Sequence, residues 1–226
     1  MTASREIILD AIRSSLKVPS NLPQIDEEAD QRIRKSLQSI TPRDAAGRLK
    51  QFAEELEKIS GEFVPLGAET EIAGHIAGVM KENGYSELAF SGERAKSVAR
   101  RLAELSPETG LVDGAEGNFE QRRDRIARIP VGLVEASWAA ADVASLAVIC
   151  DEVPSLLPHY LTECVFVLMN PKKLLANLFE LFEKMTPSNG TNIVLVAGPS
   201  RTADIEKILI LGAHGPKRLI VFPAEF

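Results

Sequence analysis

Two hydrophobic patterns alternate along the chain from about residue 41 onward. Short apolar runs predict strands, and segments whose apolar residues recur every three or four positions predict helices. The expected strands cover residues 62–66, 87–91, 109–112, 131–135, 145–149, 165–169, 193–197 and 219–222. The expected helices lie between them, at residues 42–59, 69–82, 93–104, 119–128, 171–185 and 203–211.

This alternation is typical of an α/β protein with an open, largely parallel sheet and helices on both faces. The runs at 193–197 and 219–222 contain no polar positions, as in strands that are covered on both sides. We therefore expect one doubly wound sheet. In such sheets, ligands bind beyond the carboxyl ends of the strands, where loops lead into helices.

The first forty residues follow a different pattern. Apolar residues at helical spacing predict a helix over residues 4–17. Residues 18–30 contain two prolines and an acidic run, which is the composition of a linker. The chain is thus expected to divide into an N-terminal helix with an acidic linker, residues 1–40, and an α/β domain, residues 41–226.

Nothing in the sequence predicts export or membrane insertion. Charged residues follow Met1 too closely for the apolar core of a signal peptide. The longest nearly apolar stretch, residues 131–150, is interrupted by Glu135 and Asp142, and each costs about 2.5–3.5 kcal/mol near a bilayer centre. Two buried strands explain this stretch better than one membrane helix, so we expect a cytoplasmic protein.

Composition and charge exclude further classes. The 226 residues carry 26 Lys and Arg against 32 Asp and Glu, a net charge of −6, and aromatic residues make up 5%. A nucleic-acid binder would instead show a basic footprint and aromatic platforms. Two cysteines, Cys150 and Cys164, are too few for an iron–sulfur cluster or a structural zinc site. We expect no metal and no bound cofactor in this chain.

The strongest candidate for chemistry is the segment after the apolar run at 193–197. It holds the residue types that surround a phosphate or carboxylate at the start of a helix, at Gly198, Pro199, Ser200, Arg201, Thr202 and Asp204. The alternative is a plain capped helix in which Arg201 pairs with Asp204 or Glu206. His214 is a secondary candidate, but it lies at the far end of this expected helix, roughly 13 Å away at 1.5 Å per residue.

Other candidates are weaker. Ser91 and Gly92 lie between an expected strand and an expected helix, and they form a second possible anion cradle. His75 is expected in a helix and His159 in a loop. The sequence contains no glycine-rich dinucleotide motif, no phosphate loop and no nucleophile elbow. No catalytic residue can be assigned.

The run from Gly198 to Leu219, GPSRTADIEKILILGAHGPKRL, resembles the signature of the LUD-domain family, and within it the lactate-utilisation protein C group. The segment Pro154–Pro158, the pair Ser91 and Gly92, and the strand ending at Glu135 also fit this family. The resemblance implies a fold like that of the NagB, RpiA and CoA-transferase proteins. It further implies a role in oxidising L-lactate to pyruvate alongside two iron–sulfur partner subunits, which agrees with the low cysteine count.

One departure from the family concerns a turn. Family members usually carry Thr-Gly-Thr or Thr-Gly-Ser between an acidic residue and an apolar strand, and here Asp142 is followed by Val143, Ala144 and Ser145. Val143 has no hydroxyl, and Ala144 disfavours the positive φ that glycine accepts. If this turn holds a ligand in the relatives, this chain binds a different ligand, binds it weakly or does not bind it. Glu135, Ser145 and Glu206 are further secondary site candidates.

These observations leave three hypotheses. The first is an accessory subunit of an iron–sulfur L-lactate-oxidising system, with an anion-binding loop at residues 198–204. The second is a stand-alone enzyme that binds a nucleotide-, CoA- or folate-like phosphate ligand at the same loop, by analogy of fold. The third is a scaffold whose N-terminal helix contacts a partner or a second copy of the chain, so a homo-oligomer stays open.

Overall fold

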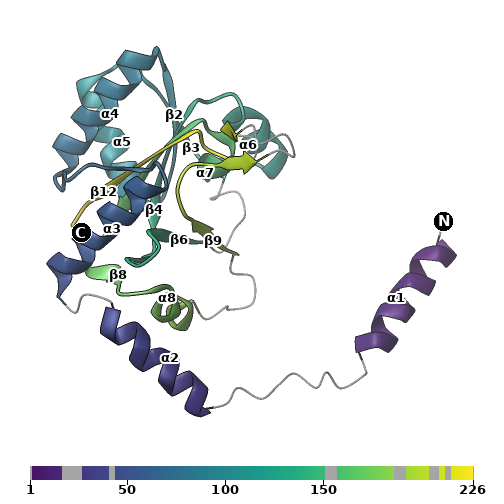
Figure 1. The fold of residues 1–226 in the computed structure, drawn as a ribbon. Coiled ribbons are helices and arrows are strands. Elements are labelled where there is room, and N and C mark those ends of the chain that lie inside the picture. The colour runs from purple at the N-terminus through teal and green to yellow at the C-terminus, as the bar shows by residue number, and fades with distance from the viewer. Residues whose placement is uncertain are drawn as a thin grey trace. The chain divides into compact units, whose positions relative to one another are not determined.

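The chain folds into two units, described by a computed structural model (Figure 1). The structure describes residues 2–16, 27–40, 44–150, 157–185, 192–203, 209–211 and 215–225. Contacts within the chain separate the units as Met1–Ile40 and Thr41–Phe226. The described residues of the first unit form α1 (Thr2–Leu16) and α2 (Glu27–Ile40).

The position of α2 corrects the sequence analysis. The acidic run was assigned to a linker up to residue 30, but α2 begins at Glu27. The charges that suggested a linker also favour the start of a helix, because three acidic residues fall in the first turn and basic residues follow. Ile33, Leu37 and Ile40 then recur at helical spacing.

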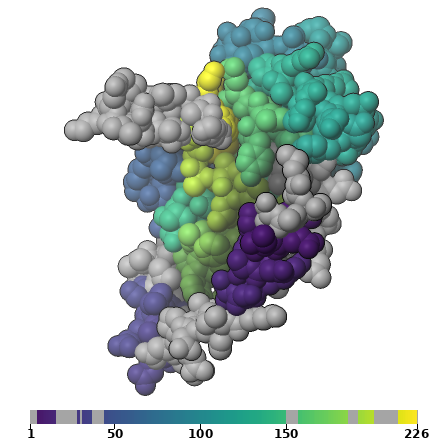
Figure 2. All heavy atoms as spheres, turned by 90° about the vertical axis from the view of Figure 1, so that its right-hand side faces the viewer, coloured from purple at the N-terminus to yellow at the C-terminus, as the bar shows by residue number. Residues whose placement is uncertain are grey.

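The main sheet of the second unit has six parallel strands in the order β1-β12-β7-β4-β2-β3, which confirms the predicted parallel sheet. Their bounds are β1 Glu62–Phe63, β2 Glu87–Ser91, β3 Gly110–Asp113, β4 Val131–Ala136, β7 Cys164–Met169 and β12 Arg218–Pro223. β12 lies between β1 and β7. From a second side, the late, yellow-green residues run through the middle of this unit between earlier, blue and teal segments (Figure 2).

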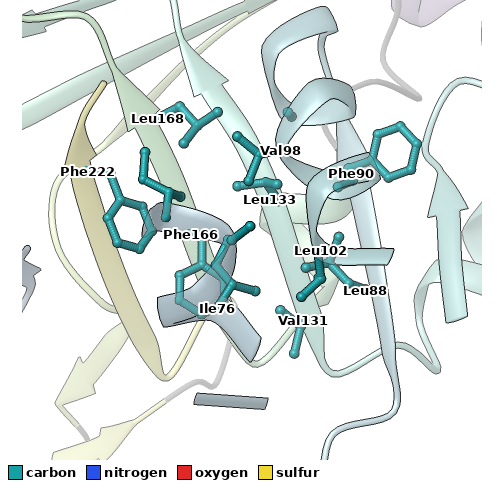
Figure 3. Close-up of a cluster of buried hydrophobic side chains, with 14 of the residues drawn as sticks. Ile76, Leu88, Phe90, Val98, Leu102, Val131, Leu133, Phe166, Leu168 and Phe222 are labelled. Carbon is teal, nitrogen blue, oxygen red and sulfur yellow. The ribbon is translucent and has the colours of Figure 1, made fainter. Parts of the chain in front are cut away.

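One face of the main sheet is covered by α4 (Glu69–Asn83) and α5 (Glu93–Leu105). Phe166 of β7 and Phe222 of β12 pack there with Ile76 of α4 and Val98 of α5 (Figure 3). These side chains are fully buried. The rings of Phe166 and Phe222 stack with centroids 5.9 Å apart, so the two central strands are joined by aromatic packing as well as by their hydrogen bonds.

The opposite face is covered by α3 (Ala45–Lys58), by a second sheet and by α6 (Phe119–Ile126) and α7 (Leu157–Leu161). Val165 and Val221, which alternate with the residues of the first face, pack against Phe52 of α3 and Leu146 of the second sheet. β7 and β12 are therefore buried on both sides, as their continuous apolar runs predicted.

The second sheet has the order β8-β5-β6-β9, with β5/β6 and β6/β9 antiparallel. Its strands are β5 Trp138–Ala140, β6 Ser145–Cys150, β8 Leu174–Leu175 and β9 Asn192–Val196. The apolar stretch at 131–150 thus forms three strands, β4, β5 and β6, rather than the two that were predicted. The prediction that residues 193–197 form a doubly covered strand was also wrong, because β9 is an edge strand and Leu195 is 39% exposed.

Two predicted helices are also corrected. The segment 171–185 starts as a 3-10 turn, η2 (Pro171–Lys173), passes through β8 and becomes helical only at α8 (Leu178–Lys184). The Asn177 side chain accepts a hydrogen bond from the N–H of Glu180 and sets this later helix start. Of the helix predicted at 203–211, residues 204–208 lie outside the described structure, and the described residues are strands: β10 (Arg201–Ala203) pairs antiparallel with β11 (Leu209–Leu211). Four successive apolar residues at 208–211, with two β-branched side chains, favour a strand.

Candidate functional site

The turn after β9 is held from two sides. Gly198 has a φ of 79°, which favours glycine, and a Cβ there would lie 3.1 Å from the side chain of Ile59, just past the end of α3. The N–H of Ser200 donates a 2.8 Å hydrogen bond to the carbonyl oxygen of Pro216. The turn is therefore fixed between the end of α3 and the segment that leads into β12.

A cavity of about 480 Å³ opens beside this turn. We call it the His159 cavity. Its walls come from β9 and the turn, from the ends of α3 and of the segment before β12, and from α7, at residues 194–200, Ile59, Gly215, Pro216, His159 and Tyr160. None of these described wall residues has a charged side chain. The cavity is of the size that holds organic ligands.

His159 is the feature of this cavity that points to chemistry. The side chain is 3% exposed, and neither ring nitrogen has a hydrogen-bond partner. Burial lowers the pKa of His159 to about 4, so the imidazole is neutral near pH 7. Its ring lies against Tyr160, with centroids 4.2 Å apart. A neutral imidazole has one donor and one acceptor nitrogen, and both lack partners here.

α7 positions His159 through a close contact with β4. A Cβ on Gly132 of β4 would come within 2.4 Å of the carbonyl oxygen of Pro158 and 2.6 Å of Oγ1 of Thr162. The Thr162 hydroxyl in turn donates a 2.6 Å hydrogen bond to that same carbonyl oxygen. The backbone of α7 therefore sits directly on β4. Residues as small as glycine are needed where two backbones approach so closely.

His159 was expected in a loop and without a functional role, but the residue lies in the helix α7. The signal that could have indicated a helix is the pair of apolar residues Leu157 and Leu161, four positions apart. No sequence pattern could have shown that the imidazole is buried without partners.

The structure brings together three residues of the predicted anion loop. Gly198, Pro199 and Ser200 line the His159 cavity. Arg201 and Thr202 belong to β10, and their side chains lie outside the described structure, as do Asp204, Glu206 and His214. Residues 201–203 form β10 where a helix start was expected. The free N–H groups of a helix start are therefore not available there to bind an anion.

The second predicted cradle, at Ser91 and Gly92, is filled by the chain itself. Oε1 of Glu135, at the end of β4, accepts hydrogen bonds from the N–H groups of Arg94 and Ala95, the latter at 2.9 Å. Gly92 has a φ of 107°, and a Cβ there would lie 2.5 Å from Oε1 of Glu135. An internal carboxylate thus occupies the start of α5, where a helix favours negative charge.

Replacing Glu135 with alanine is expected to lower the free energy of unfolding by about 2 kcal/mol, because two charge-assisted hydrogen bonds are lost. Glu135→Gln, which keeps an acceptor oxygen but loses the charge, is expected to lose about half as much. Urea denaturation of the two variants and the parent measures this. Sulfate is expected to raise the melting temperature of the alanine variant more than that of the parent, because it can bind the free N–H groups at the start of α5. An equal rise in both proteins would contradict an open anion site in the variant.

The turn between β5 and β6 retains the shape of a glycine turn. Ala144 has a φ of 46° and is fully buried, in the conformation that its side chain was expected to disfavour. Oδ1 of Asp142 is buried without a hydrogen-bond partner, and burial raises the pKa of this carboxyl group. Ser145 is buried at the start of β6. None of these residues lines the His159 cavity.

Glycine at position 144 is expected to be better tolerated than glycine at position 147, a fully buried alanine of β6 with ordinary backbone angles. Both substitutions lose a buried methyl group, but only Ala144→Gly also relieves left-handed backbone strain. We expect the two variants to differ by about 1 kcal/mol in unfolding free energy, with Ala147→Gly the less stable. Equal losses in thermal and urea unfolding would contradict strain at Ala144.

Comparison with known proteins agrees with this architecture. The family model of the LUD domain matches residues 49–222. The crystal structure of a DUF162 family protein from Deinococcus radiodurans superposes with a TM-score of 0.56 and 15% sequence identity, covering 80% of this chain and 98% of that one, which is a likeness of fold. An uncharacterised protein of Neisseria meningitidis serogroup B is 55% identical over 31 residues, which are 14% of this chain and 13% of that protein.

Within the ranges that the structure covers, no helix is both long enough and apolar enough to cross a membrane. The same residues contain no cluster of three or more His, Cys, Asp or Glu side chains that could hold a metal ion.

Proposed function

The chain belongs to the LUD-domain family, which is associated with lactate utilisation, and from this we propose that it is an accessory subunit of a cytoplasmic iron–sulfur system that oxidises L-lactate to pyruvate. The observation that carries the proposal is the extent of the family match, which spans residues 49–222 and so includes nearly all of the α/β unit. In this proposal, two iron–sulfur subunits supply the redox centres.

The cysteines of the chain support this division of labour. The sequence has only Cys150 and Cys164, whereas a [4Fe–4S] cluster is held by four thiolates. Cys164 is buried in the core, and burial raises the pKa of its thiol to about 11. A thiol that stays protonated near neutral pH is a poor metal ligand and a poor nucleophile. The two cysteines of this chain therefore cannot by themselves hold a four-thiolate iron–sulfur cluster for electron transfer.

We place the ligand site of this subunit at the His159 cavity and the predicted loop at 198–204. A second candidate is a stand-alone enzyme that binds a nucleotide-, CoA- or folate-like phosphate there. The volume of the cavity, about 480 Å³, favours this second candidate over a site for a three-carbon acid alone, because cavities of roughly 300–1,000 Å³ take larger organic groups.

The subunit proposal is tested in the native host. A chromosomally tagged chain, purified after growth on L-lactate, is expected to bring down two cysteine-rich proteins whose visible absorption shows iron–sulfur clusters. A deletion strain is expected to grow poorly on L-lactate and normally on pyruvate, which is the matched control. Purification without any iron–sulfur protein, together with normal growth of the deletion strain on L-lactate, would falsify the proposal.

The stand-alone enzyme predicts binding by the isolated chain. CoA, ATP and a folate are expected to raise its melting temperature, and Arg201→Ala, in the predicted loop, is expected to abolish the shift. If none of these phosphate or folate ligands shifts the parent, this second candidate is rejected while the subunit proposal stands.

A further inference from the structure

We infer that another cavity, at the carboxyl end of β3, binds a small zwitterion of the α-amino acid type. This cavity, which we call the Arg125 cavity, has a volume of about 210 Å³. Its walls come from the end of β3, the turn that follows and α6, and they include Asp113, Glu116, Gly117, Gln121, Arg122 and Arg125. It shares no described wall residue with the His159 cavity, so the inference goes beyond the proposed function and does not depend on it.

The Arg125 cavity lies where open parallel sheets bind ligands. Asp113 is the last residue of β3, and ligands of such sheets bind beyond the carboxyl ends of strands, where loops lead into helices. Gly117 has a φ of 94°, which favours glycine in this turn. The Asn118 side chain then accepts a 3.0 Å hydrogen bond from the N–H of Gln121 and caps α6. The turn and the helix start are thus fixed by the residues that form them.

The two signs of charge lie on different walls of the cavity. The acidic residues among its described walls, Asp113 and Glu116, come from the strand and the turn. The basic ones, Arg122 and Arg125, lie three positions apart on α6 and therefore on the same side of that helix. A ligand with a single charge would meet a like charge as well as an opposite one. A zwitterion meets an opposite charge at each end.

The spacing of the two walls matches one amino-acid residue. Oδ1 of Asp113 accepts a 2.9 Å hydrogen bond from the N–H of Ala115. Nη1 of Arg122 donates a 3.0 Å hydrogen bond to the carbonyl oxygen of the same Ala115. An acid and a cation are therefore held at the two ends of one N–Cα–C=O unit. A free α-amino acid has this same unit, with an ammonium and a carboxylate at its ends.

Glu116 and Arg125 are the wall residues open to such a ligand. Both are exposed, and in the described part of the chain neither side chain forms a hydrogen bond or an ion pair. The guanidinium fork of Arg125 suits a carboxylate. Oδ2 of Asp113 already lies 3.6 Å from Nζ of Lys96, so Glu116 is the better partner for an ammonium. We assign the ligand carboxylate to Arg125 and the ligand ammonium to Glu116.

The volume of the cavity suits a ligand of this size. About 210 Å³ is the liquid volume of about seven water molecules, at about 30 Å³ each. Alanine has a similar number of non-hydrogen atoms. Three probes on its three-carbon skeleton separate the two charges. L-Alanine carries both, L-lactate has a hydroxyl in place of the ammonium, and L-alaninamide has an amide in place of the carboxylate.

The test is an NMR titration of the full chain with these three probes. L-Alanine is expected to bind with a dissociation constant of about 1–10 mM, the range for so small a ligand. It is expected to bind about fivefold more tightly than L-lactate or L-alaninamide, since each of these lacks one ion pair. The signals that shift are expected to belong to residues 112–126. Equal binding of the three probes, shifts confined to other residues, or no binding of L-alanine up to about 50 mM overturns the inference.

Variants assign the two ends of the ligand. Glu116→Gln is expected to remove most of the preference for L-alanine over L-lactate and to keep the preference over L-alaninamide. Arg125→Gln is expected to do the reverse. Both side chains are exposed, so the melting temperature is expected to stay unchanged. Arg128→Gln, on the same stretch of chain but not among the described wall residues, is the matched control and is expected to keep both preferences.

Unchanged preferences in both wall variants would overturn the assignment of the ligand to this cavity. A preference lost equally in Arg128→Gln would show that only the general charge of the surface matters, and it would overturn the inference too. The proposed function fails on different results, those of the growth and purification experiments, so either idea can fail while the other survives.

Discussion

Replacing Gly132 with alanine is expected to lower the free energy of unfolding by about 3 kcal/mol, at the upper end of the usual loss from overpacking. The new Cβ would lie 2.4 Å from the carbonyl oxygen of Pro158 and 2.6 Å from Oγ1 of Thr162. The first of these is a backbone atom, so it can move only if α7 moves. The expected result is a lower urea midpoint at unchanged m-value.

The matched control is Gly78→Ala in α4. Gly78 is exposed within a helix, and a Cβ there meets no atom within 4 Å. Alanine is the better helix former, so this variant is expected to gain about 0.5–1 kcal/mol. A Gly132→Ala variant as stable as the parent would show that α7 does not rest on β4 as described.

Lowering the pH from 7 to 5 is expected to remove about 2 kcal/mol of stability through His159 alone. Burial holds the pKa of His159 at about 4 in the folded chain, against an ordinary value of about 6.5 when unfolded. Between these values the unfolded chain binds a proton that the folded chain does not, so stability falls as the pH falls. The loss begins near pH 6.5 and is complete near pH 4, where it totals roughly 3 kcal/mol.

His159→Leu isolates this contribution from the carboxylates that titrate in the same range. The variant lacks the group, so the difference in unfolding free energy between variant and parent is expected to widen by about 2 kcal/mol from pH 7 to pH 5. Urea unfolding at half-unit pH steps measures it. Parallel pH profiles for the two proteins would mean that the imidazole is not buried in its neutral form.

The main sheet could be predicted because each of its central strands is buried on both sides. β7 is apolar throughout and β12 is apolar from Leu219 to Phe222, and such runs between helical segments favour parallel pairing. β9 has the same composition but lies at the edge of a second sheet. Composition cannot separate the two cases, since the difference lies in which elements pack beside the strand.

The candidate site could be predicted only in part, for a related reason. The turn at Gly198, Pro199 and Ser200 is visible in the sequence because glycine and proline mark it. The prediction of a helix after this turn was wrong because the apolar residues at 208–211 fit either a helix or a strand. Residues 209–211 form a strand because they pair with β10. His159 was missed because burial without a partner is a property of the packed chain. Glu135 bonds to Arg94 and Ala95, which are 41 and 40 residues away in the sequence. These residues are close in space because β2, which leads into α5, pairs with β4 in the sheet.

The place of β12 in the main sheet has a consequence for synthesis on the ribosome. β12, residues 218–223, is the strand on which β1 pairs, and it also completes the pairing of β7. The ribosome makes β1 about 150 residues before β12. β1 therefore has no strand to pair with until β12 leaves the exit tunnel. Until then the edge of β7 on which β12 pairs stays without its backbone hydrogen-bond partners. Nascent chains stalled before residue 218 are the form of this protein that a chaperone would have to protect.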